Sequence, residues 1–383
     1  MEIDRVNIHK VTLPFFGDFS HSLKKGASAN NIVVEIVADQ GEKKGYGEGA
    51  PRLYVTGESQ ENATHSIRDF LLRDAFPWRL NDVSQVLDLV DSLPDGREHN
   101  AAICALEMSL LDLLGKKQHK SVLEYFPQDF FCDTIYYGAA LPLATKQRIV
   151  EIGQSIKKMG INRLKLKMGK DFAQNQQAIE ALSSVFGYDY DLKVDINGVW
   201  DRDLAFQHIP LIKEYKVKVI EEPMKPGDPG FGEFAEIMRD YGVILMADES
   251  ACSLRDVEDI TRDGRYQMIN IRLSKCGGFR RSFRIIDYLR NNGISFQIAC
   301  QLGESGLLSA AGRALSLLCH DAVYHDGSYD EVLLKENVTL ENVSFGPGGE
   351  AGPLGGSGLG VEVSSKNLGQ LTTATDSVTR FDC

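Results

Sequence analysis

The stretch that decides the fold is RLKLKMG, residues 163–169. Lys165 and Lys167 lie two positions apart in it, each flanked by leucine or methionine. Side chains two apart in a β-strand point to the same face, so both ammonium groups share one face and the apolar side chains share the other. If the lysine face met water, the stretch would be an ordinary edge strand. Two like charges inside a closed sheet would instead need a functional reason.

Short β-like runs of this kind recur from about residue 134, separated by helix-like stretches. The runs are TIYYGAALPL, RLKLKMG, DLKVDING, VKVIEEP, GVILMADES, MINIRLSKCGG, ISFQIACQLGES and AVYHDG. Their polar residues Lys167, Asp195, Glu221, Asp248 and Lys275 follow one another at intervals of 26 to 28 residues. Each interval holds one strand, one crossover helix and two short loops, the unit of a parallel sheet. Eight units predict a (β/α)8 TIM-type barrel, with an open doubly wound sheet as the alternative.

The rest of the chain does not share this rhythm. Residues 1–130 contain NIVVEIVADQGEKKGYGEGAP, which reads as two strands around a polar turn, and HNAAICALEMSLLDLLGKK, which reads as a helix ending near Gly115. These patterns predict an α+β domain over 1–130, followed by the barrel over 131–340. The last segment, 341–383, is rich in glycine and contains the strand-like LGVEV. It lacks the phosphate-binding glycine motifs and reads as a connection.

Composition excludes several classes of function. The chain of 383 residues has 54 acidic and 42 basic residues, a net charge of -12, which argues against a nucleic acid or an anionic membrane as partner. No run of about 18 apolar residues occurs, and the first residues lack a signal-peptide pattern, so we expect a cytoplasmic protein. The seven cysteines are scattered and never form C-x-x-C, which gives no support to a disulfide framework or a zinc site.

Polar residues stand at the ends of consecutive predicted strands, where TIM barrels carry their chemistry. In chain order they are Lys165 and Lys167, Asp195 and Asn197, Glu221 and Glu222, Asp248 and Glu249, and Lys275. Three neighbouring strands thus bring carboxylates to one rim. Buried carboxylates repel one another and are costly to desolvate, so a hard dication is expected among them. Mg²⁺ fits best, because calcium usually takes more protein oxygens and zinc usually recruits His or Cys.

The lysines are candidates for proton transfer. A lysine amine ordinarily titrates near about 10.4, and burial or a nearby cation lowers that value. Lys167 is therefore a candidate general base with Lys165 as its electrostatic neighbour, and Lys275 arrives from the opposite side of the barrel as a second base or acid. Strict alternation places Lys275 on the same face as Ile271, so its inward direction requires the strand to end or bulge near Ser274.

Each feature has a purely structural explanation when it is taken alone. Alternating lysines usually form a solvated face, and an acid at a strand end is often a helix N-cap. The recurrence of acids and lysines at the same point of one repeat favours a functional site. Neither G-x-S-x-G nor a paired Cys/His signature occurs, so nucleophilic acyl transfer has no support.

At these residues the sequence resembles the enolase superfamily, specifically its muconate lactonizing enzyme (muconate cycloisomerase) subgroup. The motifs that carry the resemblance are KLK at Lys165 and Lys167, VDING at Asp195, IEEP at Glu221, MADES at Asp248 and LSKCGG at Lys275. The resemblance implies that 1–130 is a capping domain completed by 341–383. It implies that Asp195, Glu221 and Asp248 bind one Mg²⁺, for which Mn²⁺ could substitute. Asn197 and Glu249 would lie next to these three acids. Lys167 and Lys275 would be the acid/base pair on opposite faces of a small-molecule carboxylate, in a chain that forms a homo-oligomer.

The resemblance also implies where the substrate is selected. Residues 15–30 and 50–59 would be cap loops over the site, and Glu304 and Asp326 would complete the pocket from strands seven and eight. Dipeptide epimerases of this subgroup carry Asp-x-Asp on strand eight for the substrate ammonium. This chain has Tyr324-His325-Asp326 there, so only the second acid matches.

Three functions follow from these expectations. The first is a Mg²⁺-dependent racemase or epimerase that abstracts the proton α to the carboxylate of an amino-acid derivative, an N-acyl amino acid or a dipeptide-like compound, through an enediolate. The alternatives are a muconate-type cycloisomerase or an o-succinylbenzoate synthase-type dehydratase. A non-catalytic binding module is the remaining hypothesis, but it would be expected to have lost a lysine or a metal-binding acid.

Overall fold

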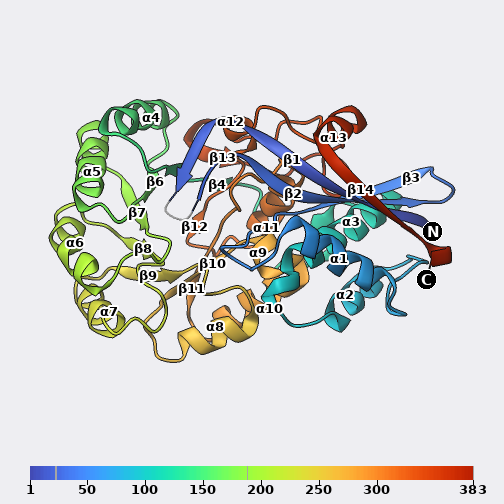
Figure 1. Ribbon diagram of the computed structural model, residues 1–383, viewed down its shortest axis with the longest axis horizontal. Helices are drawn as coiled ribbons and strands as arrows, with labels where there is room; N and C mark the ends of the chain where they lie inside the picture. Colours follow the sequence, from blue (N-terminus) through green and yellow to red (C-terminus); the bar gives the residue numbers. More distant parts are fainter. Residues whose placement is uncertain (22–23, 188, 383) are drawn as a thin grey trace.

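The molecule consists of an eight-stranded barrel and a four-stranded antiparallel sheet beside it (Figure 1). The structure is a computed structural model that describes residues 1–21, 24–187 and 189–382. The middle of the chain forms the barrel, whereas the antiparallel sheet combines strands from both ends of the chain. The interface between the two parts is therefore built from segments far apart in sequence.

The barrel strands are parallel and follow one another in chain order around the sheet. They are β5 (Ala139–Leu141), β6 (Arg163–Lys167), β7 (Asp191–Asp195), β8 (Val219–Glu221), β9 (Ile244–Ala247), β10 (Met268–Ile271), β11 (Ser295–Ile298) and β12 (Tyr324–His325). A parallel bridge between Tyr137 and His325 links the two ends of the sheet, and the Gly138 amide donates to the His325 carbonyl at 2.8 Å. This closure confirms the TIM-type barrel and rules out the open doubly wound sheet.

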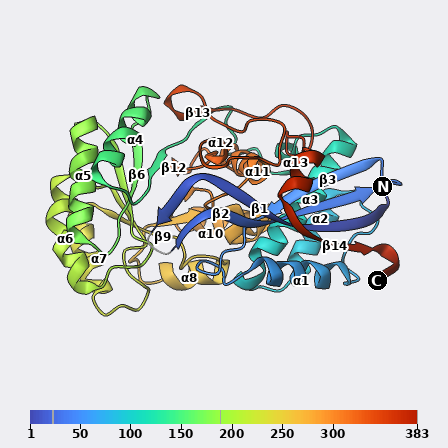
Figure 2. The same ribbon diagram turned by 45° about the horizontal axis from the view of Figure 1, so that its top comes forward.

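Helices cover the outside of the barrel, as two views show (Figures 1 and 2). They are α4 (Lys146–Lys158), α5 (Phe172–Phe186), α6 (Arg202–Glu214), α7 (Phe231–Asp240), α8 (Leu254–Thr261), α10 (Gly278–Asn291) and α11 (Gly306–Leu317). Several begin at a capping side chain that accepts a backbone amide hydrogen, as Thr145, Asp171 and Asp201 do. Two one-turn helices, α9 (Leu273–Cys276) and α12 (Asp330–Leu333), follow β10 and β12.

The lysines of the RLKLKMG stretch point into the barrel. Lys165 is only 7% exposed, and Lys167 lies at the rim with a side chain that is 14% exposed. Leu164 and Leu166, on the other face of β6, are fully buried under the outer helices. An apolar layer fills the interior nearer the N-terminal ends of the strands, and it consists of Val219, Met246, Met268 and Tyr324.

The antiparallel sheet has the strand order β14-β1-β2-β3. Its strands are β1 (Ile3–His21), β2 (Lys24–Ala38), β3 (Lys43–Gly49) and β14 (Thr372–Thr379). The helices of this part are α1 (Gln60–Leu71), α2 (Val83–Ser92), α3 (Asn100–Gln118) and α13 (Ser365–Leu371). The remaining short elements are β4 (Ile135–Tyr136), β13 (Glu350–Ala351), η1 (Arg97–His99), η2 (Val122–Tyr125), η3 (Pro347–Gly349) and η4 (Arg380–Asp382).

Two local expectations were wrong. Helix α3 does not end at Gly115 but continues to Gln118. This glycine permits a close approach, because a Cβ added to it would lie 2.7 Å from the Cα of Gly358. LGVEV forms no strand, only an isolated bridge between Thr339 and Val363. The segment that returns to the first sheet is β14, whose residues pair with β1.

Two buried acids of the antiparallel part hold helices of the barrel. Glu48 of β3 accepts hydrogen bonds from the Ser305 and Leu308 amides, at 3.1 and 3.0 Å, at the start of α11. Glu107 of α3 accepts from the amides of Phe279 and Arg280 in the first turn of α10, at 2.5 and 2.9 Å. The first amides of a helix lack partners within the helix and favour a negative charge, so each acid links the two parts.

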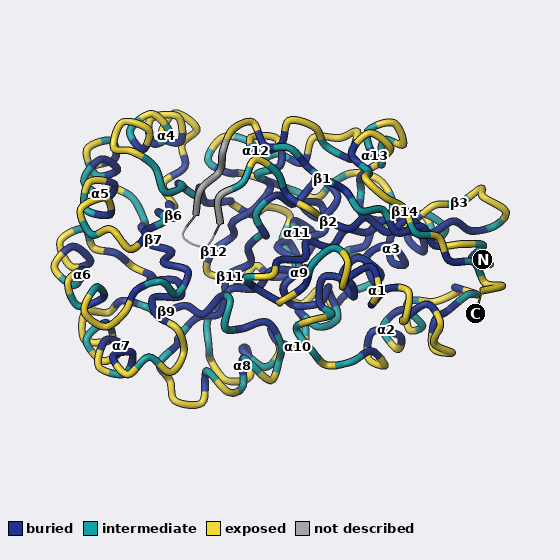
Figure 3. Tube along the Cα trace, in the orientation of Figure 1, coloured by how far each residue is buried: buried dark blue, intermediate teal, exposed yellow. Residues whose placement is uncertain are grey.

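Figure 3 shows that the barrel strands and the centre of the antiparallel part are buried, while the outer helices expose one side. The six cysteines that the structure describes are all free thiols, and Cys383 lies outside the described residues. Among the helices described, none combines the length and the apolar character needed to cross a lipid bilayer.

Candidate active site

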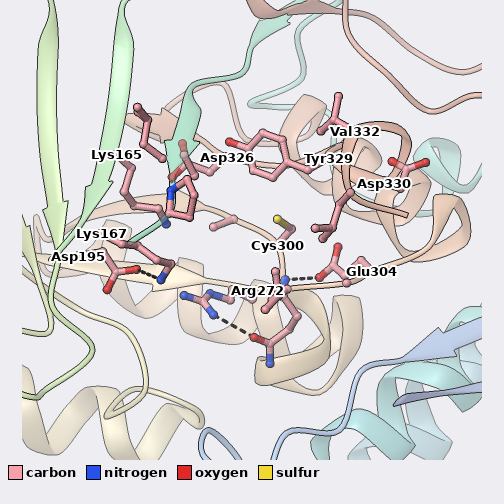
Figure 4. Close-up of a pocket in the computed structure, with 18 of the residues that line it drawn as sticks. Lys165, Lys167, Asp195, Arg272, Cys300, Glu304, Asp326, Tyr329, Asp330 and Val332 are labelled. Atoms are coloured by element: carbon pink, nitrogen blue, oxygen red, sulfur yellow. Dashed lines mark hydrogen bonds and ion pairs between the residues drawn. The ribbon is translucent and has the colours of Figure 1, made fainter. Parts of the chain in front are cut away.

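A cavity of about 380 Å³ opens at the C-terminal ends of the barrel strands. Figure 4 shows its charged residues converging from several strands and from the loops after β11 and β12. The predicted residues that line it are Lys165, Lys167, Asp195, Asn197, Glu249, Glu304 and Asp326. Glu221, Asp248 and Lys275 are fully buried behind these lining residues. Glu221 contacts Lys165, Asp248 contacts Arg272 of the cavity wall, and Lys275 contacts Asp248.

Lys167 belongs to a polar chain along the β6–β7 side of the cavity. Its ammonium lies 2.7 Å from Asp195 Oδ2 and donates to Asn197 Oδ1 at 3.2 Å. The Asn197 amide in turn donates to Glu249 Oε1 at 2.8 Å. Asn197 has a positive φ of 52°, which turns its side chain back over the strand end between these two partners. The structure thus brings four predicted residues together in one network.

Glu221 and Asp248 share a cation that the sequence reasoning missed. Arg272, just after β10, donates from Nη2 to Glu221 Oε1 at 3.3 Å and to Asp248 Oδ2. Burial opposes ionisation of Glu221, but Lys165 and Arg272 outweigh it and hold the pKa of that carboxyl below its usual range. Burial and the neighbouring acids raise the pKa of Asp248 despite Arg272 and Lys275. Alternation along the strand could have identified Arg272, because it lies two residues after Asn270 and therefore on the same face.

The backbone around Asp248 is fixed by the second acid of the EEP motif. Glu222 has a positive φ of 43°, and its Oε2 accepts from the Asp248 amide at 2.6 Å and from the Ser250 hydroxyl at 3.0 Å. Burial raises the pKa of Glu222 to about 7. This residue therefore orients the loop after β9 and does not line the central cavity.

Lys275 reaches the site from a helical turn. Strand β10 ends at Ile271, and Lys275 lies in α9, so strict strand alternation no longer applies to it. Its ammonium donates to the carbonyls of Asp248 and Asn270 at 2.8 and 2.6 Å and lies 3.2 Å from Asp248 Oδ1. Burial opposes its charge, but Asp248 outweighs that effect and raises the pKa of Lys275. The turn requires Gly278, where φ is +89° and a Cβ would meet Glu107 Oε2 at 1.9 Å.

The acids fit a hard divalent cation in charge and in donor type. All of them offer oxygen, and Glu249 Oε2 is buried without a hydrogen-bond partner, while Asp248 Oδ1 has only the Lys275 ammonium at 3.2 Å beside it. Within the described ranges, no three His, Cys, Asp or Glu side chains stand close enough to hold an ion as they are. The Arg272 guanidinium supplies the positive charge between Glu221 and Asp248.

A further buried lysine belongs to the site and was not predicted. Lys193 of β7 is 1% exposed and donates to Gln297 Oε1 at 2.7 Å and to Asp326 Oδ2 at 2.9 Å. It shares a strand face with Asp195, so the same alternation that singled out Lys165 also applied to it. Its partner Asp326 lies on the far side of the barrel, which no local pattern of the sequence indicates.

The antiparallel part closes the cavity from above. Stretch 15–30 is not an irregular loop but mostly a β-hairpin of β1 and β2, and residues 22–23 of it lie outside the described residues. From stretch 50–59, Tyr54 lines the cavity, and Arg52 donates to the Leu302 carbonyl at 2.6 Å. The predicted Glu304 accepts from the Gln301 amide at 2.5 Å, and burial raises its pKa to about 8.

Comparisons with known proteins agree with this geometry. A family model described as enolase C-terminal domain-like matches residues 148–367. The hydrophobic dipeptide epimerase of Enterococcus faecalis is 25% identical over 98% of both chains. The N-succinyl-L-Arg/Lys racemase of Bacillus cereus is 25% identical, over 99% of this chain and 100% of the relative. The solved dipeptide epimerase of Cytophaga hutchinsonii, complexed with Mg and D-Ala-L-Val, superimposes with a TM-score of 0.83 at 22% identity, over 99% of this chain and 100% of that one.

Proposed function

The chain belongs to the enolase C-terminal domain-like family, and from this premise we propose that it is a Mg²⁺-dependent racemase or epimerase. Its substrate would be the carboxylate of an amino-acid derivative, an N-acyl amino acid or a dipeptide-like compound, from which the α-proton is removed. Two relatives of nearly full length support this reaction class, since one is a dipeptide epimerase and the other an N-succinyl amino acid racemase. The Mg bound in a solved structure of similar fold supports the choice of metal.

The observation that carries the proposal is the placement of two lysines around the barrel. Lys167 ends β6 and Lys275 follows β10, and these strands are four apart in an eight-stranded closed sheet, so they face each other across it. Asp195, Glu221 and Asp248 come from the three strands between them. Inversion of a carbon centre needs a proton-transfer group on each face. Lys167 lines the cavity on one side, and Lys275 lies on the other side behind Arg272, so its ammonium would have to leave the Asp248 and Asn270 carbonyls to reach a substrate.

In the proposed mechanism, Asp195, Glu221 and Asp248 would hold Mg²⁺, which supplies a Lewis acid for the substrate carboxylate and for the charge that develops when the α-proton leaves. Lys167 takes the proton from one face, and Lys275 returns a proton to the other. Lys165 stays cationic, because Glu221 and Asp326 outweigh its burial and raise its pKa. It therefore contributes positive charge beside Glu221 and does not act as a base.

The test is proton exchange. The enzyme is incubated with Mg²⁺ in D₂O and a panel of N-acyl amino acids, dipeptides and diacids, and mass spectrometry follows deuterium at the α-carbon while chiral chromatography follows inversion. We expect exchange with inversion for at least one amino-acid derivative. Absence of deuterium from every compound would contradict the proposal, and product formation by ring closure or dehydration of a diacid would favour the cycloisomerase or dehydratase alternative.

Variants separate the two lysines. Lys275→Ala should abolish inversion and keep the Mg²⁺-dependent rise in melting temperature, because the three acids remain. Lys170→Met, which removes an exposed lysine near the same rim, is the matched control and should retain inversion. Inversion by the Lys275→Ala variant would refute the two-base scheme.

A further inference from the structure

A chain of buried charges crosses the barrel beneath the cavity. Lys193 Nζ lies 2.9 Å from Asp326 Oδ2, and Lys165 Nζ lies 3.3 Å from the same oxygen. Lys165 also lies 3.3 Å from Glu221 Oε2. None of these four side chains is more than 8% exposed. Asp326 therefore stands between two ammonium groups, and one of them is the neighbour of a proposed metal-binding acid.

Asp326 lines the cavity, and its two oxygens have different surroundings. Oδ2 is shared by the two lysines, and Oδ1 is buried without a hydrogen-bond donor. Oδ1 points toward Gly138, where an added Cβ would lie only 2.9 Å from it. Lys165 and Lys193 already share Oδ2, so a substrate ammonium at this acid would have to compete with two buried lysines.

Tyr324 of β12 lies two residues before Asp326, on the same face of the strand, and it is not an acid. The Tyr324 hydroxyl donates to Asp191 at 3.0 and 3.1 Å, at the start of β7 and away from the cavity. The Lys193 ammonium lies 4.4 Å from the centre of the Tyr324 ring, so the ring supports the lysine from below. This wall of the cavity thus ends in an occupied acid and an aromatic ring.

We infer that Asp326 is a positioning residue, which together with Lys193 fixes the Lys165 ammonium against Glu221, and that the cavity takes amino-acid derivatives whose nitrogen carries a neutral acyl group instead of dipeptides with a free ammonium. The inference rests on the proposed function and narrows its substrate class. Leu141, Leu302 and Leu333, which line the same cavity, offer an apolar surface for the acyl chain.

The substrate class is tested with a matched pair of compounds, N-propionyl-L-leucine and L-alanyl-L-leucine, which differ in the ammonium group. We expect kcat/KM for α-proton exchange with Mg²⁺ to be at least tenfold higher for the N-propionyl compound. A preference for the dipeptide, whichever acid of the cavity received its ammonium, would overturn the inference. If neither compound exchanges, the proposed function fails for this class, and calorimetric binding of the same pair still decides the preference.

Two substitutions test the role of Asp326. Asp326→Asn should lower kcat for both compounds by a similar factor and leave their ratio unchanged, because the residue acts through Lys165. If Asp326 received a substrate ammonium, KM for the dipeptide alone would rise. Lys193→Met leaves Asp326 with one cation, so it should shift the ratio toward the dipeptide by at least tenfold; an unchanged ratio would contradict the inference. Lys218→Met, at an exposed position just before β8, is the control.

The pairing of Lys193 with Asp326 is also tested without any substrate. Denaturant midpoints are compared for the wild type, Lys193→Met, Asp326→Asn and the double variant. Each single variant leaves a buried charge with fewer partners, so the double variant should lose less than the sum of the two single losses. If the stability losses of the two single variants added up to that of the double variant, the proposed pairing of Lys193 with Asp326 would be refuted.

Discussion

Replacement of Glu107 by glutamine tests how the antiparallel part holds the barrel. Both carboxyl oxygens accept amide hydrogens at the start of α10, and the residue is fully buried. Glutamine keeps the shape but replaces one acceptor by an amino group, which leaves a helix amide without its partner. The expected loss is about 1–3 kcal/mol of unfolding free energy at pH 5.

The loss should shrink as the pH rises. Burial raises the pKa of Glu107 from 4.5 to about 7, so between these values the unfolded chain releases a proton that the folded chain retains. The wild type therefore loses stability as the pH rises through this window, whereas the glutamine variant has no proton to release at this position. Between pH 5 and pH 8 the stability of the wild type relative to the variant should therefore fall by about 2–3 kcal/mol, which can cancel or reverse the loss seen at pH 5.

Urea unfolding at both pH values, followed by tryptophan fluorescence, measures this change. Trp78 precedes α2 in the antiparallel part and Trp200 follows β7 of the barrel, so the signal reports both parts. Glu236→Gln on the exposed side of α7 is the control and should show no such change. A wild type that keeps or increases its stability relative to Glu107→Gln between pH 5 and pH 8 would refute the reasoning.

Three further outcomes are expected. Gly278→Ala should lower the melting temperature far more than Gly232→Ala, because the first glycine has φ +89° and no room for a Cβ beside Glu107, whereas nothing lies within 4 Å of a Cβ at the second; equal shifts in thermal melts would contradict this. Mg²⁺ at about one hundred times its Kd should stabilise the wild type by about 2.7 kcal/mol, and Asp248→Asn should lose this gain in calorimetric scans with and without a chelator. Arg52→Lys should raise KM more than it lowers kcat in steady-state kinetics, because Arg52 holds the loop after β11 over the cavity without lining it; a fall in kcat alone would argue against this role.

The barrel was predictable because its strands obey two simple physical rules. Strands buried on both faces form short apolar runs, and parallel pairing forces a helix between them, which sets a nearly constant spacing. The same rules located Lys165, Lys167, Asp195, Glu221 and Asp248 at one end of the sheet, where the structure places them. The inward direction of Lys275 was foreseen only on the condition that the strand ends early, and it ends at Ile271.

What escaped prediction depends on contacts between distant segments. Lys193 and Asp326 are 133 residues apart and meet only because the sheet closes on itself. Glu48 and Glu107 look like ordinary acids in sequence, and only the fold brings helix ends to them. Strand β14, TTATDSVT, was overlooked because it lies at the edge of its sheet, where most side chains face solvent and no strong apolar alternation is required.

The pairing of β14 with β1 has a consequence for biosynthesis. One edge of β1 is occupied only by residues that leave the ribosome more than 350 positions later, as in the pairs of Arg5 with Thr379 and Asn7 with Ser377. Throughout translation, the nascent chain carries a strand edge with open amide and carbonyl groups, which is a template for association with other chains. Truncation before Thr372 would make this exposure permanent, so shortened products should aggregate even though every barrel strand is present.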